Sequence, residues 1–196
     1  MSRAGFLVDL HRCTGCSACV LACRIENGRT SEAAWRRVLP LNLRRSSGGP
    51  TYSLSVACHH CENPACLNAC PAGAYEKRAD GVVLHREERC LGCRYCELAC
   101  PFGTPQFDAA RGVVSKCHLC AHRLDEGLAP ACVRACPTEA LQFVTDTGAD
   151  GADARVSIPG FADPAGCRPN LRFKAPRGAR RAARFAVLDE VMKRER

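Results

Sequence analysis

The sequence predicts a small α+β protein with short strands and short helices, organised around metal clusters. Three observations support this prediction. Cysteine accounts for 17 of the 196 residues, and sixteen of these cysteines fall into four compact groups of four. The segments between the groups contain only brief apolar runs, too short for long helices or a large hydrophobic core. No stretch reaches the roughly 18 apolar residues that a membrane-spanning helix needs, so no transmembrane segment is predicted.

The spacing within the four groups suits cubane iron–sulfur clusters. The groups are Cys13, Cys16, Cys19 and Cys23; Cys58, Cys61, Cys66 and Cys70; Cys90, Cys93, Cys96 and Cys100; and Cys117, Cys120, Cys132 and Cys136. The first and third follow C-x2-C-x2-C-x3-C, the run of bacterial ferredoxins, in which three thiolates hold one cluster and the fourth ligates another. The second and fourth keep the opening pair and the closing C-x3-C but have a longer middle spacing. All sixteen thiols are therefore candidate ligands of four [4Fe–4S] clusters.

The residues beside the ligands add to this interpretation. Three groups end in Cys-Pro, where the fixed φ of proline redirects the chain after the last ligand, whereas Cys23 is followed by arginine. We expect the x3 spacing to place the last cysteine on the first turn of a helix, pointing to a neighbouring cluster. His59 and His60 lie between two ligands and either donate to cluster sulfurs or pack as ordinary side chains.

Two other uses of cysteine are disfavoured. Zinc sites use four ligands, but they do not require the third cysteine at x2, the x3 closure or the Cys-Pro pairs. A disulfide scaffold is typical of secreted proteins, and only a short apolar run precedes Cys13, so no signal peptide is predicted. Cys167 remains outside the groups, and we interpret it as a free thiol with no cluster role.

The expected elements are short and lie between the cysteine groups. Strands are expected at Gly5–Asp9, Tyr52–Val56 and Leu141–Val144, and strand pairs at 74–76 with 82–84 and at 106–107 with 113–114. Asp80-Gly81 is the turn signal of the first pair. Residues 146–178 lack periodicity and are expected to form an extended arm. From Ala179 the apolar residues recur at helical spacing, which predicts either a docking helix or a frayed terminal one.

The net charge of +8 is concentrated at the C-terminus. Residues 168–196 contain ten Lys or Arg and three acidic residues. Four cluster sites, each a dianion with its thiolates, would turn the rest of the chain into an anionic body with a cationic tail. We expect the tail to dock on a partner subunit or an anionic membrane surface. Nucleic acid is disfavoured, because no aromatic residues or recognition motif accompany the charge.

Three phrases of the sequence resemble a known family. They are Cys58-His-His-Cys-Glu-Asn-Pro-Ala-Cys66, Cys90-Leu-Gly-Cys-Arg-Tyr-Cys96 with Glu-Leu-Ala-Cys-Pro-Phe-Gly-Thr-Pro-Gln-Phe107, and Cys132-Val-Arg-Ala-Cys-Pro137. Together they resemble the four-cluster iron–sulfur subunit of the dimethyl sulfoxide reductase family of molybdopterin oxidoreductases. The resemblance covers residues 5–144.

The resemblance implies two ferredoxin-like modules, in each of which two cysteine groups swap their fourth ligands, whereas spacing alone leaves three ways to pair the groups. Residues 1–144 would form this double domain, with an outer module from 5–35 and 110–144 and an inner module from 52–109. Residues 145–196 would be the extended basic tail. The implied ligand sets are Cys13, Cys16, Cys19 and Cys136; Cys117, Cys120, Cys132 and Cys23; Cys58, Cys61, Cys66 and Cys100; and Cys90, Cys93, Cys96 and Cys70.

The family role is electron transfer without catalysis. The resemblance implies a large catalytic subunit with a molybdenum or tungsten bis-pterin cofactor as one partner, and an integral-membrane, quinone-binding anchor as the other. The chain would be peripheral to the cytoplasmic membrane through these partners, with the membrane side left open. No small-molecule substrate or nucleic acid of its own is expected. The alternatives are the four-cluster subunit of a hydrogenase or formate-oxidising complex, and a free-standing polyferredoxin.

Overall fold

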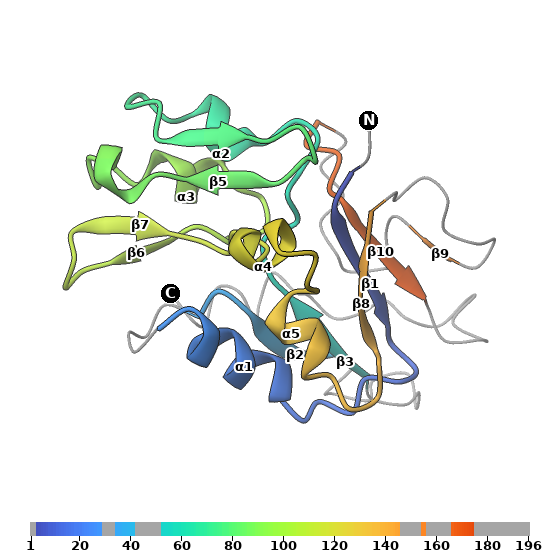
Figure 1. The fold of residues 1–196 in the computed structure, drawn as a ribbon. Helices are drawn as coiled ribbons and strands as arrows, with labels where there is room; N and C mark the ends of the chain where they lie inside the picture. The colour runs from blue at the N-terminus through green and yellow to red at the C-terminus, as the bar shows by residue number, and fades with distance from the viewer. Residues whose placement is uncertain (1–2, 29–33, 42–51, 146–153, 156–165, 175–196) are drawn as a thin grey trace.

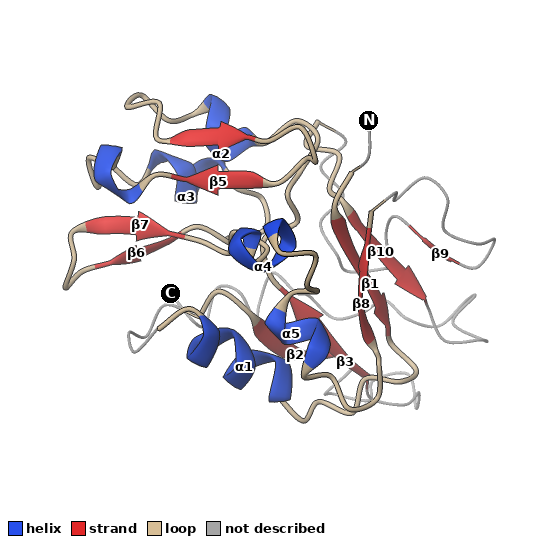
Figure 2. Cartoon of the chain, viewed as in Figure 1, coloured by secondary structure: helices blue, strands red, loops and turns tan. Residues whose placement is uncertain are grey.

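The computed structural model describes residues 3–28, 34–41, 52–145, 154–155 and 166–174. These described residues form a mixed helix and strand structure with four small sheets and short helices (Figure 1). Loops make up much of the described chain, and most of them carry the cysteine groups (Figure 2). The expected α+β class with short elements is therefore confirmed, with a ferredoxin-like domain as its main part.

The largest sheet has the strand order β8-β1-β10-β9. β1 (Gly5–Asp9) lies between β8 (Leu141–Val144), which is antiparallel to it, and β10 (Leu171–Lys174), which is parallel. β9 (Ala154–Arg155) pairs with β10 at the edge. The strands expected at 5–9 and 141–144 are confirmed. β1 is apolar along most of its length, and its first four residues are buried, so both faces of the strand are covered.

The position of β10 corrects the prediction of an extended arm. Leu171 and Phe173 point into the core and are 2% and 0% exposed, while the residues between and after them are half-buried. The segment before the strand is also tied down, because the backbone N–H and the side chain of Asn170 donate to the carbonyl oxygens of His59 and His60. Residues 166–174 thus return to the domain that we expected to end at 144. The helix expected from Ala179 and most of the basic tail lie outside the described residues.

A larger core lies between this sheet, the hairpin of β2 (Arg37–Leu41) and β3 (Tyr52–Val56), and two helices. The helices are α1 (Ala18–Glu26) and α5 (Ala131–Arg134), which pack on each other. Phe6, Leu54 and Phe173 are among its buried side chains. The strand expected at 52–56 is confirmed, and its Leu54 and Val56 share this larger core with β1 and with Val82 of the segment that follows.

A smaller core forms between two further hairpins and two helices. β4 (Tyr75–Lys77) pairs with β5 (Val83–His85), and β6 (Gln106–Asp108) pairs with β7 (Val113–Ser115). α2 (Ala65–Asn68) packs against α3 (Tyr95–Ala99), and a 3-10 turn, η1, covers Glu87–Arg89. Both expected strand pairs are confirmed, to within one residue. The turn of the first hairpin is made by Asp80, which accepts from the Val82 N–H, and by Gly81 at φ 87°.

The remaining helix, α4 (Ala121–Asp125), lies between the two cores, next to the fourth cysteine group. None of the helices in the described ranges has the length and apolar character that crossing a membrane requires.

Candidate iron–sulfur sites

The four cysteine groups form loops with one backbone pattern. In each loop the residue just before the second cysteine has a positive φ angle: Gly15 at 77°, His60 at 46°, Gly92 at 67° and Leu119 at 58°. Glycine adopts this left-handed conformation freely, whereas another L-residue is strained by roughly 1–2 kcal/mol. His60 in the second loop and Leu119 in the fourth adopt this strained conformation. This indicates that the backbone conformation at these positions is determined by the shape of the group that the loop binds.

The third cysteine of every group lies in a helix, and the fourth follows one turn later. α1 contains both Cys19 and Cys23, and Cys100 directly follows α3. Cys70 and Cys136 lie two residues beyond α2 and α5. The expectation that the fourth cysteine sits on the first helical turn is therefore wrong: Cys23 lies in the second turn of α1, and in the other three groups the fourth cysteine lies past the helix end. The helical turn carries the fourth thiol away from the loop that holds the first three.

A first cavity of about 350 Å³ lies beside β1 and β8. Its thiols are Cys13, Cys16, Cys19 and Cys136. The volume includes the solvent at its mouth. Val8, Val38 and Leu141 line the rest of the wall. Three thiols of the first group thus meet one thiol of the fourth group across an apolar cavity.

A second cavity of about 240 Å³ lies beside α1 and α5, which contribute Cys23 and Cys132 to its wall. Its thiols are Cys23, Cys117, Cys120 and Cys132. Here the exchange between the groups is reversed, because three thiols come from the fourth group and one from the first. Arg36, Asn27 and His118 supply polar groups to the wall.

A third cavity of about 320 Å³ lies between the second and third groups. Its thiols are Cys58, Cys61, Cys66, Cys100 and Cys167. The fifth thiol is Cys167, which the sequence predicted to lie away from any cluster. The structure places it on the wall of this cavity instead. Two backbone hydrogen bonds hold its segment against the second loop, from Glu62 N–H to the Arg168 carbonyl and from Asn63 N–H to the Cys167 carbonyl.

The remaining four thiols lie around the smaller core. Cys70, Cys90 and Cys96 pack there with Tyr75, and Cys93 is exposed on the third loop. Burial raises the pKa of Cys96, and the nearby charges of Cys90 and Cys70 raise it further. Three of these four thiols are therefore mutual neighbours.

Hydrogen-bond donors are aimed at many of the sulfurs. Backbone N–H groups lie 3.4 Å from Cys70 and Cys90 and 3.3 Å from Cys117, donated by Ala74, Val114 and Leu119. Hydroxyl groups of Ser55, Thr104 and Thr138 contact Cys19, Cys100 and Cys136. Such donors stabilise the thiolate form and raise the reduction potential of a ligated cluster.

The acidity of the thiols reflects their crowding. Burial raises the pKa of Cys23 and Cys66 to about 12, and the charges of neighbouring thiols add to this. Cys136 differs: burial raises its pKa, but backbone N–H groups and the Thr138 hydroxyl together bring it below 9.0. Thiols crowded in this way repel each other as thiolates unless cations lie between them, which is what iron ligation provides.

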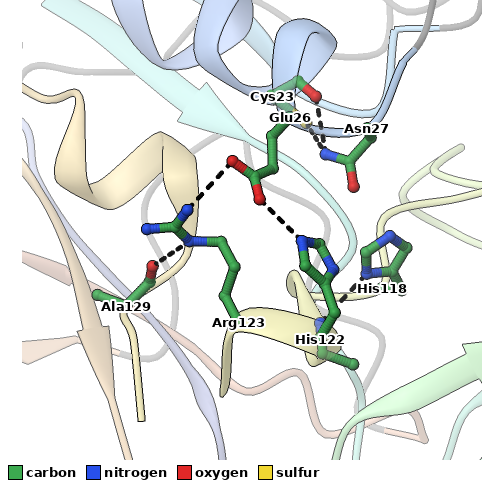
Figure 3. Close-up of polar contacts among 8 residues, drawn as sticks. Cys23, Glu26, Asn27, His118, His122, Arg123 and Ala129 are labelled. Atoms are coloured by element: carbon green, nitrogen blue, oxygen red, sulfur yellow. Dashed lines mark hydrogen bonds and ion pairs between the residues drawn. The ribbon is translucent and has the colours of Figure 1, made fainter. Parts of the chain in front are cut away.

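Polar contacts join α1 to α4 beside the second cavity (Figure 3). Glu26 accepts hydrogen bonds from His122 at 2.8 Å and from Arg123 at 3.1 Å. Asn27 donates to the Cys23 carbonyl at 2.7 Å, and its amide also approaches the Cys23 sulfur at 3.7 Å. The two contact sets fix the end of α1, and therefore Cys23, against the loop that carries the fourth group.

Several buried polar residues near the cavities were missed or left open by the sequence. His59 packs edge-on against Phe102, and burial followed by the charge of Arg36 lowers its pKa to about 3. His60 Nδ1 accepts from the Val83 N–H at 3.0 Å, which supports the packed interpretation for this side chain. Arg36 and Lys116, each 2% exposed, are buried cations to which no sequence signal pointed.

Within the described residues no three His, Cys, Asp or Glu side chains converge as ligands of a single metal ion. The thiols line three cavities instead, on loops of ferredoxin type. This fold and these sites define an iron–sulfur protein of the ferredoxin-like class, and the family described as 4Fe-4S dicluster domain matches residues 51–146.

Related proteins narrow the class. The sequence is 43% identical over 155 residues to the B subunit of the anaerobic dimethyl sulfoxide reductase of Escherichia coli K12, covering 72% of this protein and 73% of that subunit. It is 42% identical over 152 residues to the same subunit of the Haemophilus influenzae enzyme, covering 73% and 74%. It is 38% identical over 162 residues to the formate dehydrogenase iron–sulfur subunit of Wolinella succinogenes, covering 71% and 80%.

The chain therefore belongs to the family of dimethyl sulfoxide reductase iron–sulfur subunits, as the sequence phrases indicated. It binds [4Fe–4S] clusters and functions in electron transfer within an oxidoreductase.

Proposed function

We propose that this chain carries four [4Fe–4S] clusters and relays electrons between a molybdenum or tungsten bis-pterin catalytic subunit and a quinone-reactive membrane anchor. The observation that carries the proposal is the exchange of thiols between cysteine groups. Each cavity combines three cysteines of one group with the last cysteine of another, which is the arrangement of two-cluster ferredoxins. The wall residues fit such a group, because soft thiols alternate with apolar side chains and N–H donors.

The proposed ligand sets follow the cavities. They are Cys13, Cys16, Cys19 and Cys136; Cys23, Cys117, Cys120 and Cys132; Cys58, Cys61, Cys66 and Cys100; and Cys70, Cys90, Cys93 and Cys96. We call these sites 1, 2, 3 and 4. The first three sets are supported by cavity walls, and the fourth by the packing of its three neighbouring thiols around the smaller core. Cys93 is assigned to site 4 because of its position in the third loop, whose backbone conformation repeats that of the first group.

The two modules correspond to the two cores. Sites 1 and 2 adjoin the larger core, and the outer module is now taken to include β3 and β10. Sites 3 and 4 are bounded by the second and third groups and the smaller core, which form the inner module.

The contacts between sites support a linear path. Ser55 contacts Cys19 of site 1 and accepts from Arg36, which lines the cavity of site 2. Cys117 of site 2 and Cys58 of site 3 share a small buried cluster with Ala57. Cys66 of site 3 and Cys96 of site 4 share the smaller core. An electron can therefore pass from site 1 to site 4 through buried neighbours at every step.

A bound cluster would accept and release one electron without bond cleavage, and the chain's residues determine how readily it does so. The donors on sulfur favour the reduced state, and the apolar walls exclude water. We assign no catalytic residue to the chain, because the buried groups described here all serve the thiols or the packing between them.

The ends of the path carry exposed apolar side chains. Leu21 and Ile25 of α1, 61% and 73% exposed, lie on the helix that carries the first group. Leu91, Tyr95 and Leu98 are 57–78% exposed around the third group, beside the exposed Cys93. Apolar side chains beside the two terminal sites suit two protein partners. We propose that the catalytic subunit covers site 1 and the membrane anchor covers site 4, so that the chain is peripheral to the membrane.

A second candidate is the corresponding subunit of a formate-oxidising complex. It is favoured by one observation, the 38% identity to a formate dehydrogenase iron–sulfur subunit. Because this chain resembles subunits of both kinds of enzyme, the partner and not this chain would decide between them.

Anaerobic affinity purification from the native host tests the proposal. The chain is expected to co-purify with a large subunit containing molybdenum or tungsten and with a membrane protein. A formate-oxidising activity in that preparation would favour the second candidate. Nickel with a hydrogenase subunit, or a chain that carries iron but no partner, would contradict the proposal.

A further inference from the structure

Arg36 is the largest fully buried side chain in the described part of the protein. It directly precedes β2 and lies on the wall of the site 2 cavity. Its guanidinium lies 4.4 Å from the centre of the Phe6 ring, which closes one side. One hydrogen bond is formed, from Nη1 to the Ser55 hydroxyl at 2.9 Å. The Nε and Nη2 atoms are buried and find no hydrogen-bond partner among the described residues.

A buried guanidinium requires a compensating anion. Removing such a charge from water costs more free energy than a single hydrogen bond and a contact with one aromatic ring can restore. No carboxylate in the described residues forms an ion pair with Arg36. The buried Lys116 differs, because its ammonium donates to the carbonyl oxygens of Val83 and Cys117. Arg36 therefore has a charge and two donors that the surrounding protein leaves uncompensated.

The negative charges near Arg36 are cysteine thiolates of two different sites. Burial lowers the pKa of Arg36, but the thiolates of Cys132, Cys117, Cys19 and Cys23 raise it overall. Cys132, Cys117 and Cys23 belong to site 2, and Cys19 to site 1. The Ser55 hydroxyl links the two directly, since it accepts from Arg36 and lies 3.4 Å from the Cys19 sulfur.

We propose that Arg36 is an electrostatic bridge between sites 1 and 2, whose positive charge sets the reduction potentials of both clusters. The inference rests on the ligand sets of the proposed function. Reduction adds one electron to a cluster and turns its dianionic site into a trianion. A fixed positive charge stabilises the trianion more than the dianion, so it raises the potential. Arg36 is a positioning and tuning residue and exchanges no electron itself.

The test compares Arg36→Gln with the wild type in the complex purified anaerobically from the native host. Glutamine removes the charge but keeps a side-chain donor. Potentiometric titration with dithionite as the electron source, followed by electron paramagnetic resonance, gives the midpoint potential of each cluster. We expect the potentials of two of the four clusters to fall by about 59 mV or more. For one electron this shift is about a tenfold decrease in the equilibrium constant for reduction. The other two should change far less.

Two further variants separate charge from structure. Arg36→Lys keeps the charge without the planar fork and should restore both potentials. Arg24→Gln removes a charge from an exposed position next to Cys23, where water screens it, and should shift the potentials much less. The inference is wrong if Arg36→Gln binds its full iron but its cluster potentials match those of Arg24→Gln. It is also wrong if the potentials of Arg36→Lys are as low as those of Arg36→Gln.

Iron content guards against a folding defect. If Arg36→Gln binds less iron, the Arg36→Lys variant decides between the two roles. Full iron content and wild-type potentials in Arg36→Lys would support the electrostatic bridge. Loss of iron in both variants would show that Arg36 has a packing role only. Failure of the proposed function gives a different result, because the wild-type complex itself would then lack four cubane signals.

Discussion

At the residue scale, the chain strains its backbone and buries its charges where the thiols gather. His60 and Leu119 adopt the left-handed conformation that glycine occupies in the other two loops. Arg36 and Lys116 are buried among sulfurs that would repel each other as thiolates. Each of these features is unfavourable in isolation, so each gives a substitution whose effect depends on a bound cluster.

Cys61 and Cys167 give the sharpest residue-scale comparison, because both line the cavity of site 3. Cys61→Ser should lower the iron content by between one atom and a whole cluster, about four atoms, since a required ligand is lost. Cys167→Ser should leave iron and sulfide unchanged, because four other thiols remain. Iron and acid-labile sulfide analysis measures both. The reverse pattern would show that Cys167, and not Cys61, is the ligand.

Gly92 tests the loop conformation. Its φ is 67°, and a Cβ there would come within 2.5 Å of the Gly112 carbonyl oxygen. Gly92→Ala should therefore speed the release of iron to a chelator, through strain of about 1–2 kcal/mol together with this collision. Gly127→Ala is the matched control, since Gly127 has φ 75° but nothing within 4 Å. Equal release rates in the two variants would show that the contact with Gly112 does not matter.

At the element scale, α4 connects the hairpin of the smaller core to the helices of the larger one. Arg78, just after β4, bonds to both carboxylate oxygens of Asp125 at the end of α4, at 2.5 and 3.0 Å. On its other side, α4 meets α1 through Glu26. These contacts are exposed, so each contributes little alone, but together they fix the relative positions of the elements that carry Cys120 and Cys23.

The Arg78 hydrogen bonds lower the pKa of Asp125 below its usual 3.8. The pair therefore stabilises the folded protein above that pH, and the stabilisation is lost as the pH falls through the lowered value. Asp125→Asn should release iron slightly faster than the wild type after a pH jump to any value above about 4. The two rates should converge below the pKa.

Glu76→Gln controls for a general charge effect, because the Glu76–Arg86 pair lies within one hairpin. If the iron-release rates of the wild type and Asp125→Asn still differ at the lowest pH, the Asp125 carboxylate does not act through its charge.

Much of the element arrangement could be predicted because cysteine spacing and turn signals are local. The strands at 5–9, 52–56 and 141–144 and both hairpins of the smaller core were predicted from short local signals, such as the alternation at 52–56 and the Asp80-Gly81 turn. β10 was missed, since four residues with only Leu171 and Phe173 apolar gave a weak signal inside a segment rich in Gly, Pro and Ala. Its pairing with β1 is set by contacts 165 residues apart in sequence, which no local pattern reveals.

The site was predictable to a similar extent. The sixteen cysteines could be named from spacing, while their pairing required a resemblance, because three pairings satisfy the same spacing. The burial of Arg36 could not be predicted, since Arg36 and Arg37 look like an ordinary surface pair in the sequence. Cys167 was misjudged because its segment was expected to lie in an arm and instead returns against the second loop.

At the scale of the whole molecule, four thiol sets adjoin two cores that meet near α4, and the two terminal sets lie beside exposed apolar side chains. The sheet order β8-β1-β10-β9 unites the beginning and the end of the described chain in a single core. This arrangement suits a subunit that passes electrons through its interior from one partner to another, and it makes the number of clusters the central claim.

Native mass spectrometry of the anaerobically purified complex tests that claim directly, because it weighs this chain separately from its partners. The account predicts a chain that carries four [4Fe–4S] clusters, about sixteen iron and sixteen sulfide in all. Loss of one cluster's ligand, as in Cys61→Ser, should give a species lighter by up to one cluster. A wild-type chain that carries zinc, or fewer than four clusters when fully loaded, would contradict the account.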